Sequence, residues 1–146
     1  TINIARTVYG GDGNDTILGG NGNAIDLGGP GNDNISTGNG ADMLVGGTGA
    51  DALAGGNGGD VLIAGSTSFE DPSAAGQVFW CGAQSAWLRG SSSPLIGSGA
   101  GRNLFDDGVA DTLNGESGVD VFYLNLVNGV LDTSDAKASE VKRDLS

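Results

Sequence analysis

A unit of nine residues repeats six times in register between Gly10 and Ile63. The units read GGDGNDTIL, GGNGNAIDL, GGPGNDNIS, TGNGADMLV, GGTGADALA and GGNGGDVLI, and four have the form GGxGxDxUx, where U is a large aliphatic residue. The glycines and the acid predict a tight turn, and the last three positions predict a short strand. Because so short a strand is unstable alone, the units are expected to stack on one another.

Two consecutive units make one coil of 18 residues with a strand on each side. Odd units then stack on odd units and even on even, through parallel pairing and with right-handed winding as the default. The sequence therefore predicts an all-β fold, a right-handed parallel β-roll (β-solenoid) of two flat sheets. Position 8 of each unit forms the core between them, and this column contains Val8, Ile17, Asp26, Ile35, Leu44, Leu53 and Leu62.

The composition favours cations as partners. The chain has 18 acidic and 6 basic residues, no histidine and a formal net charge of −12. This charge argues against nucleic acid, because phosphates would be repelled. Without histidine, Ser-His and Cys-His arrangements are absent, so no catalytic residues are assigned and an enzyme is not expected. No stretch is long and apolar enough to predict a membrane span.

Position 6 of the repeat carries an acid in five of the six units, and stacking would place carboxylate above carboxylate. The column contains Asp15, Ala24, Asp33, Asp42, Asp51 and Asp60. Oxygen ligands without histidine or cysteine suit a hard cation such as Ca²⁺ better than a transition metal.

The segments GGDGND, GGPGND, GGTGAD and GGNGGD resemble the RTX (repeats-in-toxin) calcium-binding nonapeptides of secreted bacterial proteins, which form parallel β-rolls. Residues 106–123 resemble a degenerate closing pair of the same family. In that pair Asp111 and Asp120 take the acid position, and Leu113 and Phe122 take the core position.

The resemblance implies several calcium ions, each between turns 18 residues apart. One turn would give the carbonyls of positions 2 and 4 and its aspartate, and the next the carbonyls of positions 1 and 3 and its aspartate. The first implied site combines Gly11, Gly13 and Asp15 with Gly28, Pro30 and Asp33. The second combines Gly29, Gly31 and Asp33 with Gly46, Thr48 and Asp51, and the third, on the even edge, combines Gly38, Gly40 and Asp42 with Gly55, Asn57 and Asp60.

The second unit breaks the acid column at Ala24. Either its site is empty or weak, or the unit shifts by one residue, with Asn23 at position 6, Ile25 in the core and Asp26 released to solvent. The shift is slightly favoured, because an unpaired Asp26 between the sheets would be costly. Arg6 stands at the acid position of the preceding unit. A guanidinium there could close the ladder without metal, but a surface arginine is the favoured interpretation.

The outward positions of the even units are apolar: Ile25, Leu27, Met43, Val45, Val61 and Ile63. Such a face must be covered or used for association. We expect the insertion, residues 64–105, to cover it with a short helix between Asp71-Pro72 and Gly90 that carries Trp80 and Trp87. A disordered insertion is the alternative.

Four regions are predicted: a calcium-binding β-roll (1–63), the insertion (64–105), degenerate repeats and closing strands (106–131) with a hairpin about Asn128-Gly129, and a C-terminal tail (132–146). The resemblance implies that the tail directs type I secretion. The chain has no initiator methionine, which favours a fragment of a longer bacterial protein.

The expected function is that of an extracellular calcium-binding module that folds on Ca²⁺ after secretion. The alternative is a self-assembling subunit of an extracellular fibre, surface layer or adhesin. That alternative needs a homo-oligomer or filament joined through the open solenoid ends or the apolar even sheet.

Overall fold

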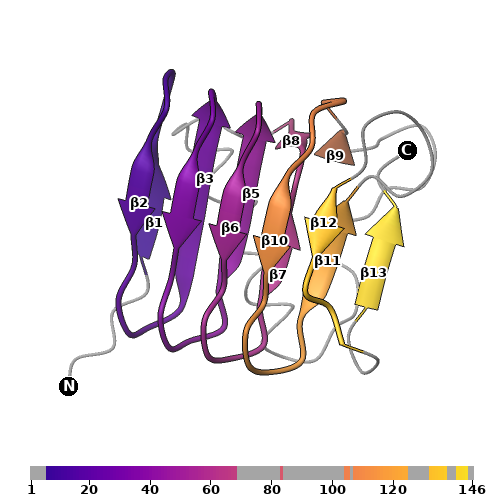
Figure 1. Cartoon of the computed structure of the whole chain (residues 1–146). Coiled ribbons are helices and arrows are strands. Elements are labelled where there is room, and N and C mark those ends of the chain that lie inside the picture. Colours follow the sequence, from indigo (N-terminus) through magenta and orange to yellow (C-terminus); the bar gives the residue numbers. More distant parts are fainter. Residues whose placement is uncertain are drawn as a thin grey trace.

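A computed structural model describes residues 6–68, 83, 104–105, 107–124, 132–137 and 141–144. Within these ranges the chain winds into stacked coils, with one strand of each coil in each of two facing sheets (Figure 1). The all-β parallel β-roll expected from the sequence is confirmed.

The two sheets correspond to the even and odd units of the repeat. The even sheet has the order β1-β3-β5-β7-β11-β13, and the odd sheet has the order β12-β10-β6-β4-β2. The even strands are β1 (Arg6–Tyr9), β3 (Ala24–Pro30), β5 (Met43–Thr48), β7 (Val61–Ile63), β11 (Val121–Leu124) and β13 (Val141–Asp144). The odd strands are β2 (Thr16–Leu18), β4 (Asn34–Ser36), β6 (Ala52–Ala54), β10 (Thr112–Asn114) and β12 (Thr133–Ser134).

Strand pairing follows the repeat length. All pairs in the two main sheets are parallel, and Ile17 lies opposite Ile35 while Leu44 lies opposite Leu62. The degenerate pair continues both sheets, because β10 pairs with β6 and β11 with β7. Stacking of odd units on odd and even on even therefore holds through the closing pair.

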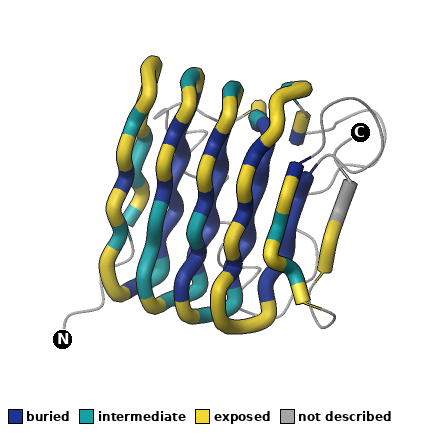
Figure 2. Tube along the Cα trace, in the orientation of Figure 1, coloured by how far each residue is buried: buried dark blue, intermediate teal, exposed yellow. Residues whose placement is uncertain are grey.

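The core lies between the sheets and is formed by position 8 of each unit. In the odd strands one buried residue stands between exposed or partly exposed neighbours (Figure 2). The buried residues are Ile17, Ile35, Leu53 and Leu113. Opposite them lie Leu44, Leu62 and Phe122, each fully buried. The predicted aliphatic column is thus the core, with Asp26 as its single acidic member among the described units.

The outward face of the even sheet is also buried. Its six apolar side chains, Ile25, Leu27, Met43, Val45, Val61 and Ile63, are at most 2% exposed. Ala83, a described residue of the insertion, is buried in the same hydrophobic cluster. The apolar even face is therefore covered within one chain. Trp80, Trp87 and the helix expected around them lie outside the described residues.

Two features were not predicted. A two-stranded antiparallel sheet, β8 (Ser66–Thr67) with β9 (Leu104–Phe105), holds the two ends of the insertion side by side. The tail adds β12 to the odd sheet and β13 to the even sheet. The hairpin expected about Asn128-Gly129 lies outside the described residues.

Within the described ranges, no helix has the length and apolar character needed to cross a membrane.

Candidate metal centre

The aspartates of the odd edge form one continuous ladder. The backbone N–H of Asp15 donates to Oδ1 of Asp33 (2.7 Å), and that of Asp33 donates to Oδ1 of Asp51 (2.8 Å). The ladder crosses the insertion, because the N–H of Asp51 donates to Asp111 (2.7 Å) and that of Asp111 to Asp132 (3.0 Å). Each carboxylate of this ladder from Asp33 onward is thus fixed by the turn stacked on it.

The even edge carries a shorter ladder of the same kind. The N–H of Asp42 donates to Oδ1 of Asp60 (2.9 Å), and that of Asp60 donates to Oδ1 of Asp120 (2.8 Å). At its N-terminal end the N–H of Ala24 donates to Oδ1 of Asp42 (2.6 Å). Ala24 therefore occupies the acid position of its turn but has no carboxylate.

The second carboxylate oxygen of these residues has a different environment. Oδ2 is buried and accepts no hydrogen bond in Asp15, Asp33, Asp42, Asp60 and Asp111. A buried, unsatisfied anionic oxygen is costly unless a proton or a cation compensates it. Its repetition at five places makes a bound cation the simplest physical account.

Backbone carbonyls converge on the same points. A Cβ atom built on Gly28 would lie under 3.0 Å from Oδ2 of Asp33 and from the carbonyl oxygen of Gly46. One built on Gly10 would lie 2.7 Å from Oδ2 of Asp15 and 2.6 Å from the carbonyl oxygen of Gly28. These pairs of oxygens belong to the second and first implied sites, respectively.

The remaining carbonyls of the two odd sites also lie at the interface between turns. The carbonyls of Gly11 and Gly13 point at the next turn, so a Cβ on Gly29 or Gly31 would collide with them. The N–H of Gly13 donates to the carbonyl of Pro30 (2.8 Å). In the second site the carbonyls of Gly29 and Gly31 point in the same way at Gly47 and Gly49, and the carbonyl of Thr48 accepts from Gly31 (2.7 Å).

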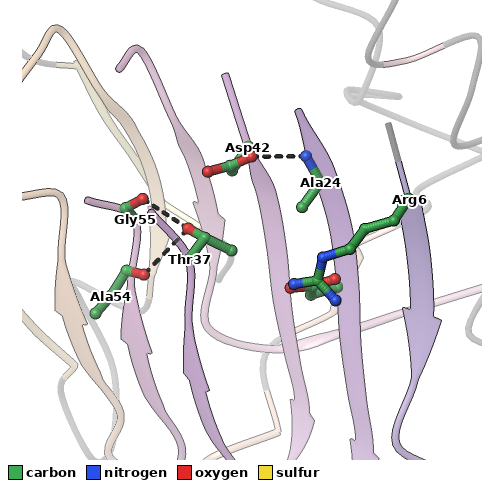
Figure 3. A network of polar contacts seen from close by, with 7 residues as sticks. Arg6, Ala24, Thr37, Asp42, Ala54 and Gly55 are labelled. Atoms are coloured by element: carbon green, nitrogen blue, oxygen red, sulfur yellow. Dashed lines mark hydrogen bonds and ion pairs between the residues drawn. The ribbon is translucent and has the colours of Figure 1, made fainter. Parts of the chain in front are cut away.

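The third site has the same frame with one substitution. The carbonyls of Gly38 and Gly40 point at the turn that contains Asp60, and the carbonyl of Asn57 accepts from the N–H of Gly40 (2.9 Å). Thr37 replaces the first glycine of its unit. Its hydroxyl donates to the carbonyl of Gly55 (2.6 Å), which is one of the implied ligands (Figure 3).

The donor set fits Ca²⁺. No group of three or more acidic, histidine or cysteine side chains converges on one point among the described residues. Each candidate site would therefore depend on backbone carbonyls together with two carboxylates from neighbouring turns. Many oxygens with few side chains, on a pliant glycine frame, match calcium rather than zinc or copper.

Burial raises the pKa of four ladder aspartates in the metal-free chain. Burial raises the pKa of Asp33 and of Asp42. Burial also raises the pKa of Asp60 to about 8, with Asp42 and Asp120 contributing as like charges, and raises that of Asp111 to about 8. A divalent cation between the carboxylates would favour their ionised forms, so metal and protons compete here.

The predicted one-residue shift in the second unit is wrong. Ile25 pairs with Met43 and Asp26 with Leu44, so the unit keeps the frame of its neighbours. Asn23 stays at position 5, where its side chain accepts from the N–H of Ala41 (3.0 Å). Asp26 is fully buried, and burial raises its pKa to about 6 although the adjacent Arg6 lowers it.

The surface interpretation of Arg6 is also wrong. Its guanidinium forms an ion pair with the carboxylate of Asp26. The two residues that looked like separate irregularities of the repeat are therefore partners across neighbouring coils.

Sequence reasoning missed two further acids at the odd edge. Asp132 ends the ladder, and Asp107 accepts from the N–H of Gly49 (2.6 Å) and of Val109 (3.0 Å). A signal for Asp132 was present, because the dipeptide Asp-Thr that opens odd strands at Asp15 and Asp111 recurs there.

Comparison with known proteins agrees with this geometry. Residues 7–25, 27–62 and 103–131 match the RTX calcium-binding nonapeptide repeat in four copies. No curated protein and no solved structure matches the chain. The matched segments cover more than half of the sequence and contain both aspartate ladders up to Asp120. The chain therefore belongs to the RTX calcium-binding nonapeptide repeat family.

Proposed function

We propose that this calcium-binding module is a calcium-responsive folding unit of a secreted bacterial protein. At the low calcium of the cytosol the stacked carboxylates repel one another and the chain stays expanded. After export, calcium at about millimolar concentration fills sites of the weak extracellular class and the roll forms. The supporting observation is the row of buried Oδ2 atoms that accept no hydrogen bond.

The energetics of linkage favour such a switch. A glycine-rich chain loses much conformational entropy on folding, about 1–2 kcal/mol for each ordered backbone residue. An ion that binds only the folded chain adds about 2.7 kcal/mol when its concentration is 100 times its dissociation constant. The short strands and the small core do not offset this loss of entropy alone, and several bound ions together can supply the rest.

We assign the ions to the three sites implied by the repeat and to the turns that close the roll. Asp51 with Asp111 on the odd edge, and Asp60 with Asp120 on the even edge, would continue the two rows across the insertion. These contacts join residues 60 apart in the sequence, so an ion there would close a long loop that contains the insertion.

The decisive experiment is a calcium titration of the chelated protein, followed by circular dichroism and sedimentation velocity, with bound ions counted by equilibrium dialysis. We expect β-structure, compaction and several bound ions to appear together. A chain that is equally compact after exhaustive chelation would contradict the proposal. Filaments at millimolar calcium would instead favour a fibre or adhesin subunit.

A matched pair of variants ties the response to the ladder. Asp33→Asn removes the charge shared by the first two sites, whereas Asp12→Asn removes the same charge from an exposed turn residue. We expect the first to raise the calcium midpoint and lower the number of bound ions, and the second to match the parent. Equal behaviour of the two variants would argue against the site assignment.

A further inference from the structure

The second turn of the even edge, residues 19–24, lacks the oxygen that its counterparts share. In five turns a Cβ built on the first glycine would lie under 3.0 Å from Oδ2 of the same turn's aspartate, as for Gly10 with Asp15, Gly28 with Asp33, Gly46 with Asp51, Gly55 with Asp60 and Gly115 with Asp120. At Gly19 the atom found there is Nη2 of Arg6, at 2.8 Å. A guanidinium nitrogen thus occupies the place of a carboxylate oxygen.

Strand pairing within the even sheet explains how the guanidinium reaches this place. Arg6 on β1 lies directly beside Ala24 on β3, and Val8 lies beside Asp26. Ala24 holds the position in its turn that Asp42 holds in the next turn, and its methyl group is smaller than the aspartate side chain (Figure 3). The arginine side chain reaches the buried carboxylate of Asp26, and its Nη2 lies beside Gly19.

We propose that Arg6 is a built-in cation that replaces a calcium ion at the second turn, so that the first coil of the even edge is held together without metal. This rests on the proposed calcium binding at the other turns. The even edge then takes up ions only from the turn of Asp42 onward.

Charge and donor chemistry support the substitution. Among the described residues, Asp26 is the only acid in a column whose other members are Val8, Leu44, Leu62, Phe122 and the exposed Lys142. Its buried carboxylate therefore needs a permanent partner. A guanidinium keeps its charge at any pH and can donate several hydrogen bonds in one plane. It also repels a divalent ion from a turn that has no carboxylate of its own.

The first test removes the cation. Arg6→Gln is compared with Lys142→Gln, which removes the same charge from an exposed position on β13. At saturating calcium we expect Arg6→Gln to lower Tm by about 10 °C, because it leaves Asp26 buried without its partner. Added calcium should not restore the loss, and the number of bound ions should stay at the parent value. A Tm equal to that of Lys142→Gln, or restoration by calcium, would overturn the proposal.

The second test converts the turn into a metal site. The triple variant Arg6→Ala/Ala24→Asp/Asp26→Leu supplies the missing carboxylate, removes the guanidinium and completes the aliphatic column. We expect one more calcium ion per chain by equilibrium dialysis, whereas Ala24→Asp alone should gain none because the guanidinium remains. A folded triple variant with the parent ion count, or an extra ion in Ala24→Asp alone, would overturn the proposal.

The two proposals fail in different ways. If the parent protein bound no calcium, the proposed function would be wrong, and the proposed replacement of calcium would be wrong with it. If the parent bound calcium but Arg6→Gln behaved like Lys142→Gln, only the role of Arg6 would be wrong. If the triple variant did not fold, the comparison of Arg6→Gln with Lys142→Gln would still decide whether Arg6 has the proposed role.

Discussion

At the scale of the residue, the two carboxylate oxygens of a ladder aspartate such as Asp33 have separate tasks. Oδ1 of Asp33 accepts from the backbone N–H of Asp15 in the neighbouring turn, which fixes the stacking, and its buried Oδ2, which accepts no hydrogen bond, is the oxygen that we propose binds calcium. An asparagine can perform the first task and lacks the charge for the second. The asparagines at position 5 illustrate this, because Asn14 and Asn32 accept from the next turn on the exposed rim.

The glycines of the turns can be tested individually. Gly31 has φ +138°, and a Cβ there would collide with the carbonyl of Gly13, an implied ligand. Gly13 itself has φ +119° with open space around it, and Gly20 has neither constraint. We expect Gly20→Ala to be neutral and Gly13→Ala to cost about 1–3 kcal/mol of backbone strain. Gly31→Ala should cost more and also weaken calcium binding, as measured by urea denaturation and dialysis. Equal costs for the last two variants would show that the carbonyl contact is unimportant.

The raised pKa values predict how pH acts on the calcium-free protein. Burial holds Asp60 and Asp111 at pKa values of about 8, above their ordinary value of 3.8, so the folded chain binds more protons than the unfolded chain. Their contribution to stability is complete below about pH 4 and is lost as the pH rises through about 8. Calcium-free samples should therefore gain β-structure on acidification, as seen by circular dichroism.

The same groups predict the opposite trend for calcium. Binding must displace their protons, so calcium affinity should rise between about pH 6 and about pH 8 and then level off. Isothermal titration in buffers of different ionisation enthalpy would report the released protons. An affinity independent of pH in this range would show that these carboxylates are not ligands.

The residue scale is also where prediction from sequence was weakest. Ala24 and Asp26 are departures from a nine-residue pattern, and Arg6 is a third departure one coil earlier. The pattern treats each as an isolated exception. Only the pairing of β1 with β3 shows that the three departures belong together. It places the cation Arg6 beside Ala24, which has no carboxylate, and within reach of the buried anion Asp26.

At the scale of the element, the repeat period predicted most of the fold. The strands from β2 to β7, their parallel pairing and the continuation at β10 follow from a fixed spacing that permits one way of stacking. The short strands β8, β9, β12 and β13 lie outside the regular nine-residue units and were missed. They form because backbone groups at the open edges and at the base of the insertion find partners there.

The insertion gives a prediction of its own. The outward even face is buried, and both tryptophans of the chain belong to the insertion. If the insertion packs on that face only when the sheet exists, calcium should shift tryptophan emission to shorter wavelength and reduce quenching by iodide. Magnesium at equal concentration is the control, because its strict octahedral demand does not suit these sites. Emission that is unchanged by calcium would show that the tryptophans are not part of the cover.

At the scale of the whole molecule, the two edges of the roll are unequal. The odd ladder runs through five aspartates from Asp15 to Asp132, whereas the even ladder has three, and Arg6 lies beyond its N-terminal end. Each coil contacts its neighbours in the stack, so stability is close to a sum of nearest-neighbour terms. If neighbouring calcium ions share carboxylates, as we propose, those terms depend on the ions on both sides of each coil.

This coupling predicts that position along the roll determines the cost of losing a carboxylate. Asp51 lies within the odd ladder and would serve an ion on each side, while Asp15 lies at its N-terminal end and serves one. At 100-fold saturation the loss of two ions removes about 5 kcal/mol and the loss of one about 2.7 kcal/mol. Asp51→Asn should therefore raise the calcium midpoint more than Asp15→Asn and lower the steepness of the transition, because it separates the first coils from the closing pair. Equal midpoints and equal steepness would mean that the sites bind calcium independently, and the coils would then not fold as one cooperative stack.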